Sequence, residues 1–176
     1  MKDLNIVFAG FGGQGILFAG KVVAYAGSSR AESSLGCRPT ARRCAAAPRI
    51  AAFVSPMNHR LAACDEPNVL IAMNRPSLDK FVNEVEPGGT ILLDSSLIDE
   101  RVERDDVTVF YVPASKLAEE NGLKGLANII LVGKLRKELA FCTEETLDKA
   151  LQKCIPARKA DMLGFNRKAL EIGKAQ

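Results

Sequence analysis

Short apolar runs alternate with segments of helical periodicity along most of this chain. Runs of this length indicate strands covered on both faces, as in parallel sheets. They occur at Asn5–Ala9, Val69–Met73, Thr90–Asp94 and Val107–Val112. Apolar residues three and four positions apart predict helices, at Ile16–Ala26, Asn74–Val85, Ser115–Glu120, Leu126–Leu139, Leu147–Lys153 and Ala157–Gly173. The alternation predicts an α/β fold of three layers, with helices on both faces of a mainly parallel sheet.

The segment Ser28–Ala63 interrupts this alternation. It is rich in arginine, alanine and proline, Glu32 is its only acidic residue, and no apolar period extends over a whole element. Arginine and proline without apolar alternation disfavour strands. We therefore expect this segment to be irregular. Its histidine, His59, and its arginines invite a general-base or anion-patch interpretation, but nothing else in the segment supports either one.

Composition narrows the class of protein. A chain of 176 residues with 47% hydrophobic content predicts one domain, residues 1–176, that buries a core without disulfides or metal. The net charge of +3 and the lack of a basic stripe interleaved with aromatics argue against nucleic-acid binding. No run reaches the roughly 20 apolar residues of a membrane span, and the first residues do not form a signal peptide. We expect a cytoplasmic protein.

The cysteines and other reactive side chains show no catalytic or metal-binding pattern. The five cysteines form no C-x-x-C pair, whereas zinc and iron–sulfur sites need closely spaced thiolates. There is no Ser/His/Asp arrangement, no clustered carboxylates, and no lysine after the glycines in the manner of a P-loop. The chain is therefore expected to bind a ligand or a partner rather than to carry out chemistry unaided.

The most informative motif follows the first predicted strand. Gly10, Gly12 and Gly15 have the G-x-G-x-x-G spacing and precede an apolar helix, which gives the chain a Rossmann-like start. Glycines permit a tight turn and a close approach of the backbone to a ligand. Since the first N–H groups of a helix lack partners and face the positive end of its dipole, this loop can hold an anion without a basic side chain.

Two other interpretations of the glycines remain open at this point. An NAD- or FAD-binding chain places an acidic residue about 20 positions after the loop, at the end of a second strand. Glu32 is the only nearby candidate, and it lies in a stretch without a strand pattern. Alternatively, the glycines only let the helix pack against the strand, in which case Gly12→Val should impair folding.

Three further polar residues are candidates for a site. Ser95 and Ser96 follow a predicted strand, and ligands of open α/β sheets bind at the carboxyl ends of strands. A simple turn explains both serines equally well. Asn128 stands in an otherwise apolar helix, where it needs hydrogen-bond partners. It is either satisfied by the backbone or used to contact a ligand or another subunit.

The sequence from Val7 to Lys21 resembles the opening of the gamma subunit of 2-oxoacid:ferredoxin oxidoreductases, which act on pyruvate, 2-oxoisovalerate, 2-oxoglutarate or indolepyruvate. These gamma chains begin with a strand, G-x-G-G-Q-G and a helix. The match consists of Gly10, Gly12, Gly13, Gln14 and Gly15. Later stretches also fit, namely Pro87–Gly89, Asp94–Ser96, Val112–Ala114, Asn128 and Asn166–Leu170.

The resemblance implies a non-autonomous subunit. In this family, thiamine diphosphate held by other subunits attacks the 2-oxoacid, electrons pass through iron–sulfur clusters to ferredoxin, and the product leaves as acyl-coenzyme A. The implied partners are alpha and beta subunits, a ferredoxin-like delta subunit, and ferredoxin as acceptor. This chain holds no cofactor alone. Its implied contacts with coenzyme A or phosphate are the glycine-loop amides and Gln14, and Asn128 is a weaker candidate.

The chain departs from the family between about residues 28 and 63. Family members have S-Y-G-P-E-x-R-G-G here, followed by a strand that ends near S-D-E-P, and neither motif is present. Reading plausible codons for these motifs one base later yields Cys37–Pro48 and Ser55–Arg60 as they stand. We hypothesise that this segment is translated out of frame and that the frame is restored by Asp65. An intact coding sequence, without compensating insertion and deletion, would refute this.

Two functions of other classes compete with the subunit interpretation. One is a free-standing oxidoreductase that binds NAD or FAD, and the other is a non-catalytic interaction module. The sequence does not select among the possible 2-oxoacids.

Overall fold

The computed structural model describes residues 4–28, 50–56 and 67–176. A five-stranded sheet forms its centre, with the strand order β2-β1-β3-β4-β5 and every neighbouring pair parallel. The strands are β1 (Leu4–Gly10), β2 (Ile50–Pro56), β3 (Val69–Ala72), β4 (Thr90–Asp94) and β5 (Thr108–Val112). The helices are α1 (Ile16–Ser28), α2 (Arg75–Phe81), α3 (Ala114–Glu120), α4 (Ala127–Leu139), α5 (Glu144–Cys154), the short 3₁₀ helix η1 (Ala157–Lys159) and α6 (Met162–Ala175).

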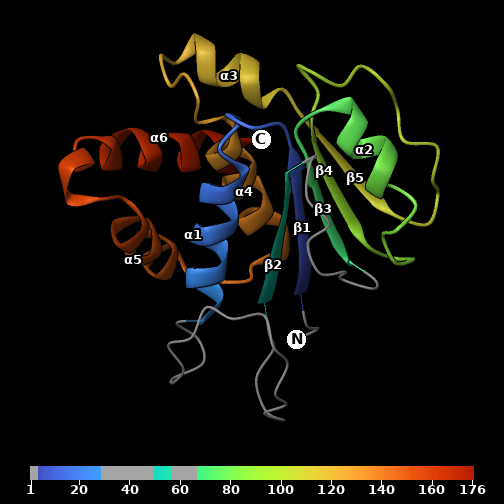
Figure 1. Cartoon of the computed structure of the whole chain (residues 1–176), viewed down its shortest axis with the longest axis horizontal. Helices are drawn as coiled ribbons and strands as arrows, with labels where there is room; N and C mark the ends of the chain where they lie inside the picture. Colours follow the sequence, from blue (N-terminus) through green and yellow to red (C-terminus); the bar gives the residue numbers. More distant parts are fainter. Residues whose placement is uncertain (1–3, 29–49, 57–66) are drawn as a thin grey trace.

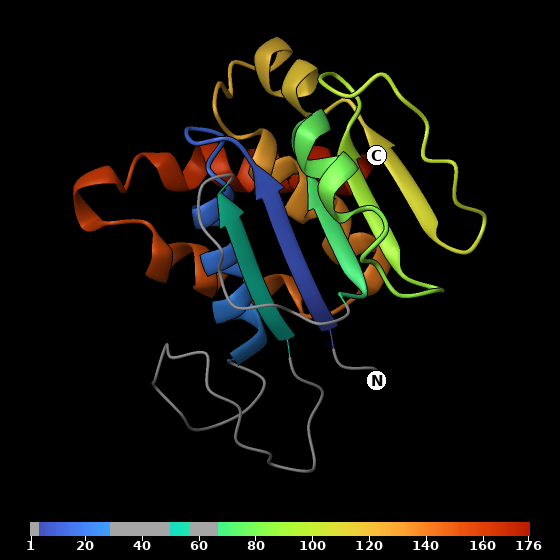
Figure 2. The same ribbon diagram turned by 45° about the vertical axis from the view of Figure 1, so that its right-hand side comes forward.

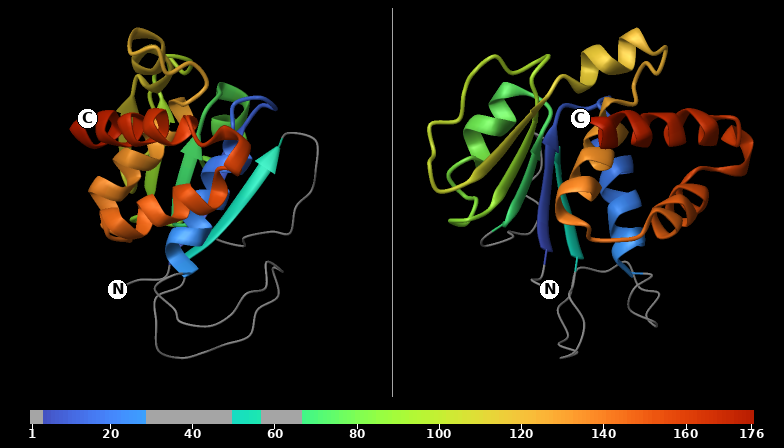
Figure 3. Two further views of the ribbon diagram at one scale, coloured as in Figure 1. Left: turned by 90° about the vertical axis from the view of Figure 1, so that its left-hand side faces the viewer. Right: turned by 180° about the vertical axis from the view of Figure 1, so that it is seen from behind.

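The two faces of the sheet are covered unequally (Figures 1 and 2). Side chains alternate along each strand, so Ile6, Phe8 and Ile71 belong to one core cluster and Val7, Ala9 and Leu70 to the other. The first cluster lies beneath α1 and α4, with α5 and α6 packed outside them (Figure 3). The second lies beneath α2 and the segment that leads to β5. The predicted three-layer α/β fold is confirmed.

Helix α4 is the most deeply buried helix of the described residues. Four consecutive residues, Ile129 to Val132, are fully buried, because the sheet lies on one side of α4 and α6 packs closely on the other. Two glycines allow this approach. A Cβ added at Gly133 would lie 2.4 Å from the carbonyl oxygen of Leu170, and one added at Gly173 would lie 1.9 Å from that of Ile130. The backbones of α4 and α6 are therefore in direct contact.

Most of the predicted elements appear at or within a few residues of their predicted positions. The helix predicted from Asn74 begins as α2, where the Asn74 side chain accepts a hydrogen bond of 2.9 Å from the Ser77 N–H. The last predicted helix is divided into η1 and α6. Residues 157–161 are all exposed, so no buried apolar face holds them in an α-helix before Met162.

The prediction that Ser28–Ala63 is irregular is wrong for Ile50–Pro56, which forms β2. This strand pairs with β1 along its whole length, from Leu4 opposite Ile50 to Gly10 opposite Pro56. The sequence Ile-Ala-Ala-Phe-Val suits a strand once it has a neighbour. Pro56 is tolerated because it is the last residue of an edge strand. Residues 29–49 and 57–63, which include Glu32 and His59, lie outside the described residues.

Candidate functional site

The glycine loop lies at the carboxyl end of β1, where the chain leaves the sheet for α1. β1 has β2 on one side and β3 on the other. The chain runs from β1 through α1 to β2, whereas it runs from β3 through α2 to β4, in the opposite direction along the sheet. This is the switch point at which open α/β sheets bind ligands. The loop is visible above β1 and before α1 in Figure 2.

Gln14 ties the loop to the neighbouring strand. Its Nε2 donates to the carbonyl oxygen of Met73 at 2.8 Å. Its Oε1 accepts from the Phe11 N–H at 2.6 Å and from the Asn74 side-chain amide at 3.3 Å. Both ends of the Gln14 amide are thus bonded within the chain, and its side chain spans the gap between the ends of β1 and β3. The sequence marked Gln14 as a polar group of the loop but did not reveal this bridge, because Met73 lies far away in sequence.

The four glycines of the loop, at positions 10, 12, 13 and 15, differ in whether the structure would tolerate a side chain there. A Cβ at Gly10 would lie 2.7 Å from Gln14 Oε1 and 3.0 Å from Ile16 Cγ2. Gly13 and Gly15 have φ angles of 92° and 73°, which side-chain-bearing residues rarely adopt. Gly12 has neither constraint, since its φ is not in the left-handed region and a Cβ there would meet nothing within 4 Å. Within this chain, Gly12 does not need to be glycine.

The loop presents backbone N–H groups to the outside. Gly12 and Gly13 are exposed, and neither of their N–H groups has an acceptor among the described residues. The N–H groups of Ile16 and Leu17, in the first turn of α1, have no acceptor there either. Phe11 and Leu17 flank this surface and are 44% and 65% exposed. The arrangement can hold an anionic group next to an apolar one.

Asn128 lies directly against this loop. Its Nδ2 donates to the Gly15 carbonyl oxygen at 2.8 Å, a contact between residues 113 positions apart. The residue is 3% exposed, and its Oδ1 has no hydrogen-bond partner among the described residues. The expectation that the backbone supplies the hydrogen-bond partners of Asn128 therefore holds for its Nδ2 but not for its Oδ1.

Ser95 and Ser96 belong to a turn organised by Asp94. The fully buried Asp94 carboxylate accepts from the Ser96 N–H at 3.1 Å, from the Ser115 N–H at 3.0 Å and from the Ser115 hydroxyl at 2.5 Å. Ser96 Oγ accepts from the Lys116 N–H at 3.1 Å. These contacts cap α3, so the turn interpretation of the two serines is favoured. The sequence marked Asp94 as the end of a strand but did not reveal its role in this turn, because Ser115 lies 21 positions away.

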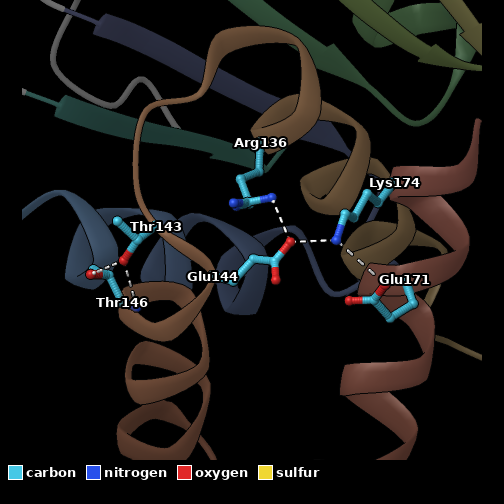
Figure 4. Close-up of polar contacts among 6 residues, drawn as sticks. All are labelled: Arg136, Thr143, Glu144, Thr146, Glu171 and Lys174. Atoms are coloured by element: carbon cyan, nitrogen blue, oxygen red, sulfur yellow. Dashed lines mark hydrogen bonds and ion pairs between the residues drawn. The ribbon is translucent and has the colours of Figure 1, made fainter.

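A cavity of about 340 Å³ lies between α4, α5 and α6 and is lined by charged residues. Glu144 contacts Arg136 at 3.1 Å and also pairs with Lys174 (Figure 4). The hydrogen bond from Lys174 lowers the pKa of Glu144, and the same bond raises the pKa of Lys174. On the same lining, Arg167 holds Asp148 at 2.5 Å and lowers the pKa of its carboxyl. Each carboxylate of the lining has a basic partner, so these contacts join the three helices.

The part of the chain that the structure describes offers neither a metal site nor a membrane-spanning helix. No group of three or more His, Cys, Asp or Glu side chains there is arranged to hold a metal ion. Cys142 and Cys154 are buried, and burial raises the pKa of the Cys154 thiol. None of the helices described is both long and apolar enough to cross a membrane.

Comparison with known proteins identifies the family. The family model described as pyruvate ferredoxin/flavodoxin oxidoreductase matches residues 5–176. The chain belongs to this family. The predicted family is therefore confirmed, and so is the oxidoreductase class of the complexes that contain such chains.

Relatives of the chain include subunits of two lengths. The 2-oxoglutarate synthase subunit KorC of Methanocaldococcus jannaschii is 27% identical over 97% of this chain and 94% of its own length. The ketoisovalerate oxidoreductase subunit VorA of Methanothermobacter thermautotrophicus is 31% identical over 97% of this chain. The chain spans only 36% of that longer subunit, where the corresponding region is one part of a larger polypeptide.

Solved structures agree on the fold. The gamma subunit of a keto/oxoacid ferredoxin oxidoreductase from Geobacter sulfurreducens superposes with a TM-score of 0.71, at 22% identity over 97% of this chain and 95% of that one. A 2-oxoglutarate:ferredoxin oxidoreductase from Magnetococcus marinus, solved with 2-oxoglutarate, coenzyme A and succinyl-CoA, gives 0.72 at 22% identity. The superposition covers 99% of this chain and 31% of that larger polypeptide.

Proposed function

We propose that the chain is the gamma subunit of a 2-oxoacid:ferredoxin oxidoreductase and that its glycine loop binds a phosphate group of coenzyme A. The complex oxidatively decarboxylates a 2-oxoacid to an acyl-CoA in the cytoplasm and passes the electrons to ferredoxin. Thiamine diphosphate and the iron–sulfur clusters belong to the partner subunits. This chain contributes unpaired backbone N–H groups of the Gly10–Gly15 loop and no reacting side chain.

The exposed N–H groups of Gly12 and Gly13 carry this proposal. They lack acceptors among the described residues and adjoin the N-terminus of α1, where an anion is favoured by the helix dipole. The open space at Gly12 adds support. Nothing within the chain requires glycine at this position, but the close approach of a ligand to the backbone would. We assign Gln14 the role of holding the loop in this shape, since both ends of its amide are bonded within the chain.

A dinucleotide-binding oxidoreductase fits the loop less well. The Gln14 side chain spans the ends of β1 and β3 through its bond to Met73, and this is where a dinucleotide fold passes the pyrophosphate. In addition, β2 (Ile50–Pro56) contains no Asp or Glu that could bind a ribose hydroxyl.

Replacing Gly12 by aspartate tests the proposal. The carboxylate has room in the fold and would repel a phosphate at the loop, so we expect KM for coenzyme A to rise at least about tenfold, about 1.4 kcal/mol of binding. The thermal midpoint should stay unchanged. The measurement is steady-state kinetics of the complex, purified through a tag on this chain.

The matched control is Gly164→Asp, which introduces the same charge in α6, where a Cβ also meets nothing within 4 Å. It should leave KM unchanged. An unaltered KM in the Gly12 variant would refute binding at the loop. Purification of the chain without subunits that carry thiamine diphosphate and iron–sulfur clusters would refute the role as a subunit.

A further inference from the structure

The contact between Asn128 and Gly15 joins the buried helix α4 to the first residue before α1. The Gly15 carbonyl oxygen accepts from the Phe18 and Ala19 N–H groups at 3.0 and 3.1 Å, as at any helix start, and additionally from Asn128 Nδ2 at 2.8 Å. The fit is close, since a Cβ at Gly15 would lie 2.5 Å from that nitrogen. A third donor from a different helix fixes the orientation of this carbonyl.

Fixing the Gly15 carbonyl also fixes the next N–H group. In a trans peptide the C=O and N–H bonds point in opposite directions. Because three donors hold the Gly15 oxygen toward α1 and α4, the Ile16 N–H is directed away from them, out of the N-terminal end of α1. This N–H has no acceptor among the described residues, and it follows the exposed Gly12 and Gly13 closely in the chain.

The side-chain oxygen of Asn128 indicates that this residue is not present to stabilise the fold. Its Oδ1 is buried without a hydrogen-bond partner in the described part of the chain, and such an acceptor destabilises a fold. The following residues, Ile129 and Ile130, are fully buried aliphatics. A leucine at position 128 would remove the unpartnered oxygen, and the Gly15 oxygen would still keep two donors.

We propose that Asn128 is a positioning residue, which orients the Gly15–Ile16 peptide so that the Ile16 N–H completes the anion-binding group with Gly12 and Gly13. The proposal rests on anion binding at the glycine loop. Asn128 does not itself touch the ligand in this assignment. It acts through its Nδ2 alone, and its unpartnered oxygen is the consequence of presenting that nitrogen to Gly15.

The test is Asn128→Leu in the purified complex, with kinetics and thermal unfolding measured together. We expect KM for coenzyme A to rise about fivefold with kcat unchanged, while the thermal midpoint stays the same or rises. Asn166→Leu is the matched control. Asn166 in α6 is also buried with an unpartnered Oδ1, but its Nδ2 donates within its own helix, to the Met162 oxygen at 2.7 Å. Its substitution should leave KM unchanged.

The outcomes separate this inference from the proposed function. A lower thermal midpoint with unchanged KM for Asn128→Leu would mean that Asn128 is only structural and would overturn the inference. If Asn128→Leu does not fold, Asn128→Ala provides the same KM measurement. A normal KM in Asn128→Leu together with a raised KM in Gly12→Asp refutes the inference alone, whereas normal values in both refute anion binding at the loop.

Discussion

Gly173→Ala is expected to lower the free energy of unfolding by about 3 kcal/mol, the upper end of what overpacking of a core costs. The added Cβ would lie 1.9 Å from the Ile130 carbonyl oxygen and 2.8 Å from its carbon. Both atoms belong to the backbone of α4, so neither can move aside by changing a rotamer. Relief requires that α4 and α6 separate, which would loosen the largest core cluster. Denaturant unfolding of the purified protein measures the change.

Gly164→Ala is the control for this variant, because it makes the same substitution in the same helix. Gly164 is exposed and a Cβ there meets nothing within 4 Å. Alanine should therefore stabilise α6 slightly, by up to about 1 kcal/mol from helix propensity. Equal effects of the two substitutions would show that the contact between α4 and α6 is not tight at Gly173.

Asp94→Asn is expected to lower the free energy of unfolding by about 2–3 kcal/mol, because hydrogen bonds to a buried charged group are lost and donors are left unpaired. Both carboxylate oxygens of Asp94 accept hydrogen bonds, Oδ1 from Ser96 and Ser115, and Oδ2 from Ser115. An amide offers only one oxygen, so its NH₂ group must face donors. The turn after β4 and the start of α3 would both be weakened. Thermal or urea unfolding monitored by circular dichroism provides the measurement.

The control for this prediction is Asp99→Asn, five residues later on an exposed position. It should change stability by less than about 0.5 kcal/mol, as substitutions on the surface usually do. A variant at Asp94 that unfolds like the Asp99 variant would mean that the carboxylate charge does not hold the turn.

Much of the fold was predictable from local pattern. The buried strands β1, β3 and β4 are nearly unbroken apolar runs, and a run of this kind fits only a sheet covered on both faces. The start of α2 was predictable because Asn74 and Pro76 are typical residues for a helix N-terminus. Such signals lie within a few residues of the feature that they predict.

The features that escaped prediction depend on contacts distant in sequence. The strand signal of β2 is short and lies within a segment rich in arginine and alanine, and pairing with β1 stabilises it as a strand. Likewise, the bonds from Gln14 to Met73 and from Asn128 to Gly15 link elements 59 and 113 positions apart. The glycine spacing located the loop, whereas these bonds determine its shape.

The exposed amides at Gly12 and Gly13 have a consequence for how such a site evolves. A peptide N–H carries no titratable proton in the physiological range, and among ordinary substitutions only proline removes it. Codon changes here therefore leave the donors in place and act only by bulk, charge or backbone angle. A substitution at either position can therefore change the bulk, charge or backbone angle of the loop, while the hydrogen-bonding groups themselves are inherited unchanged.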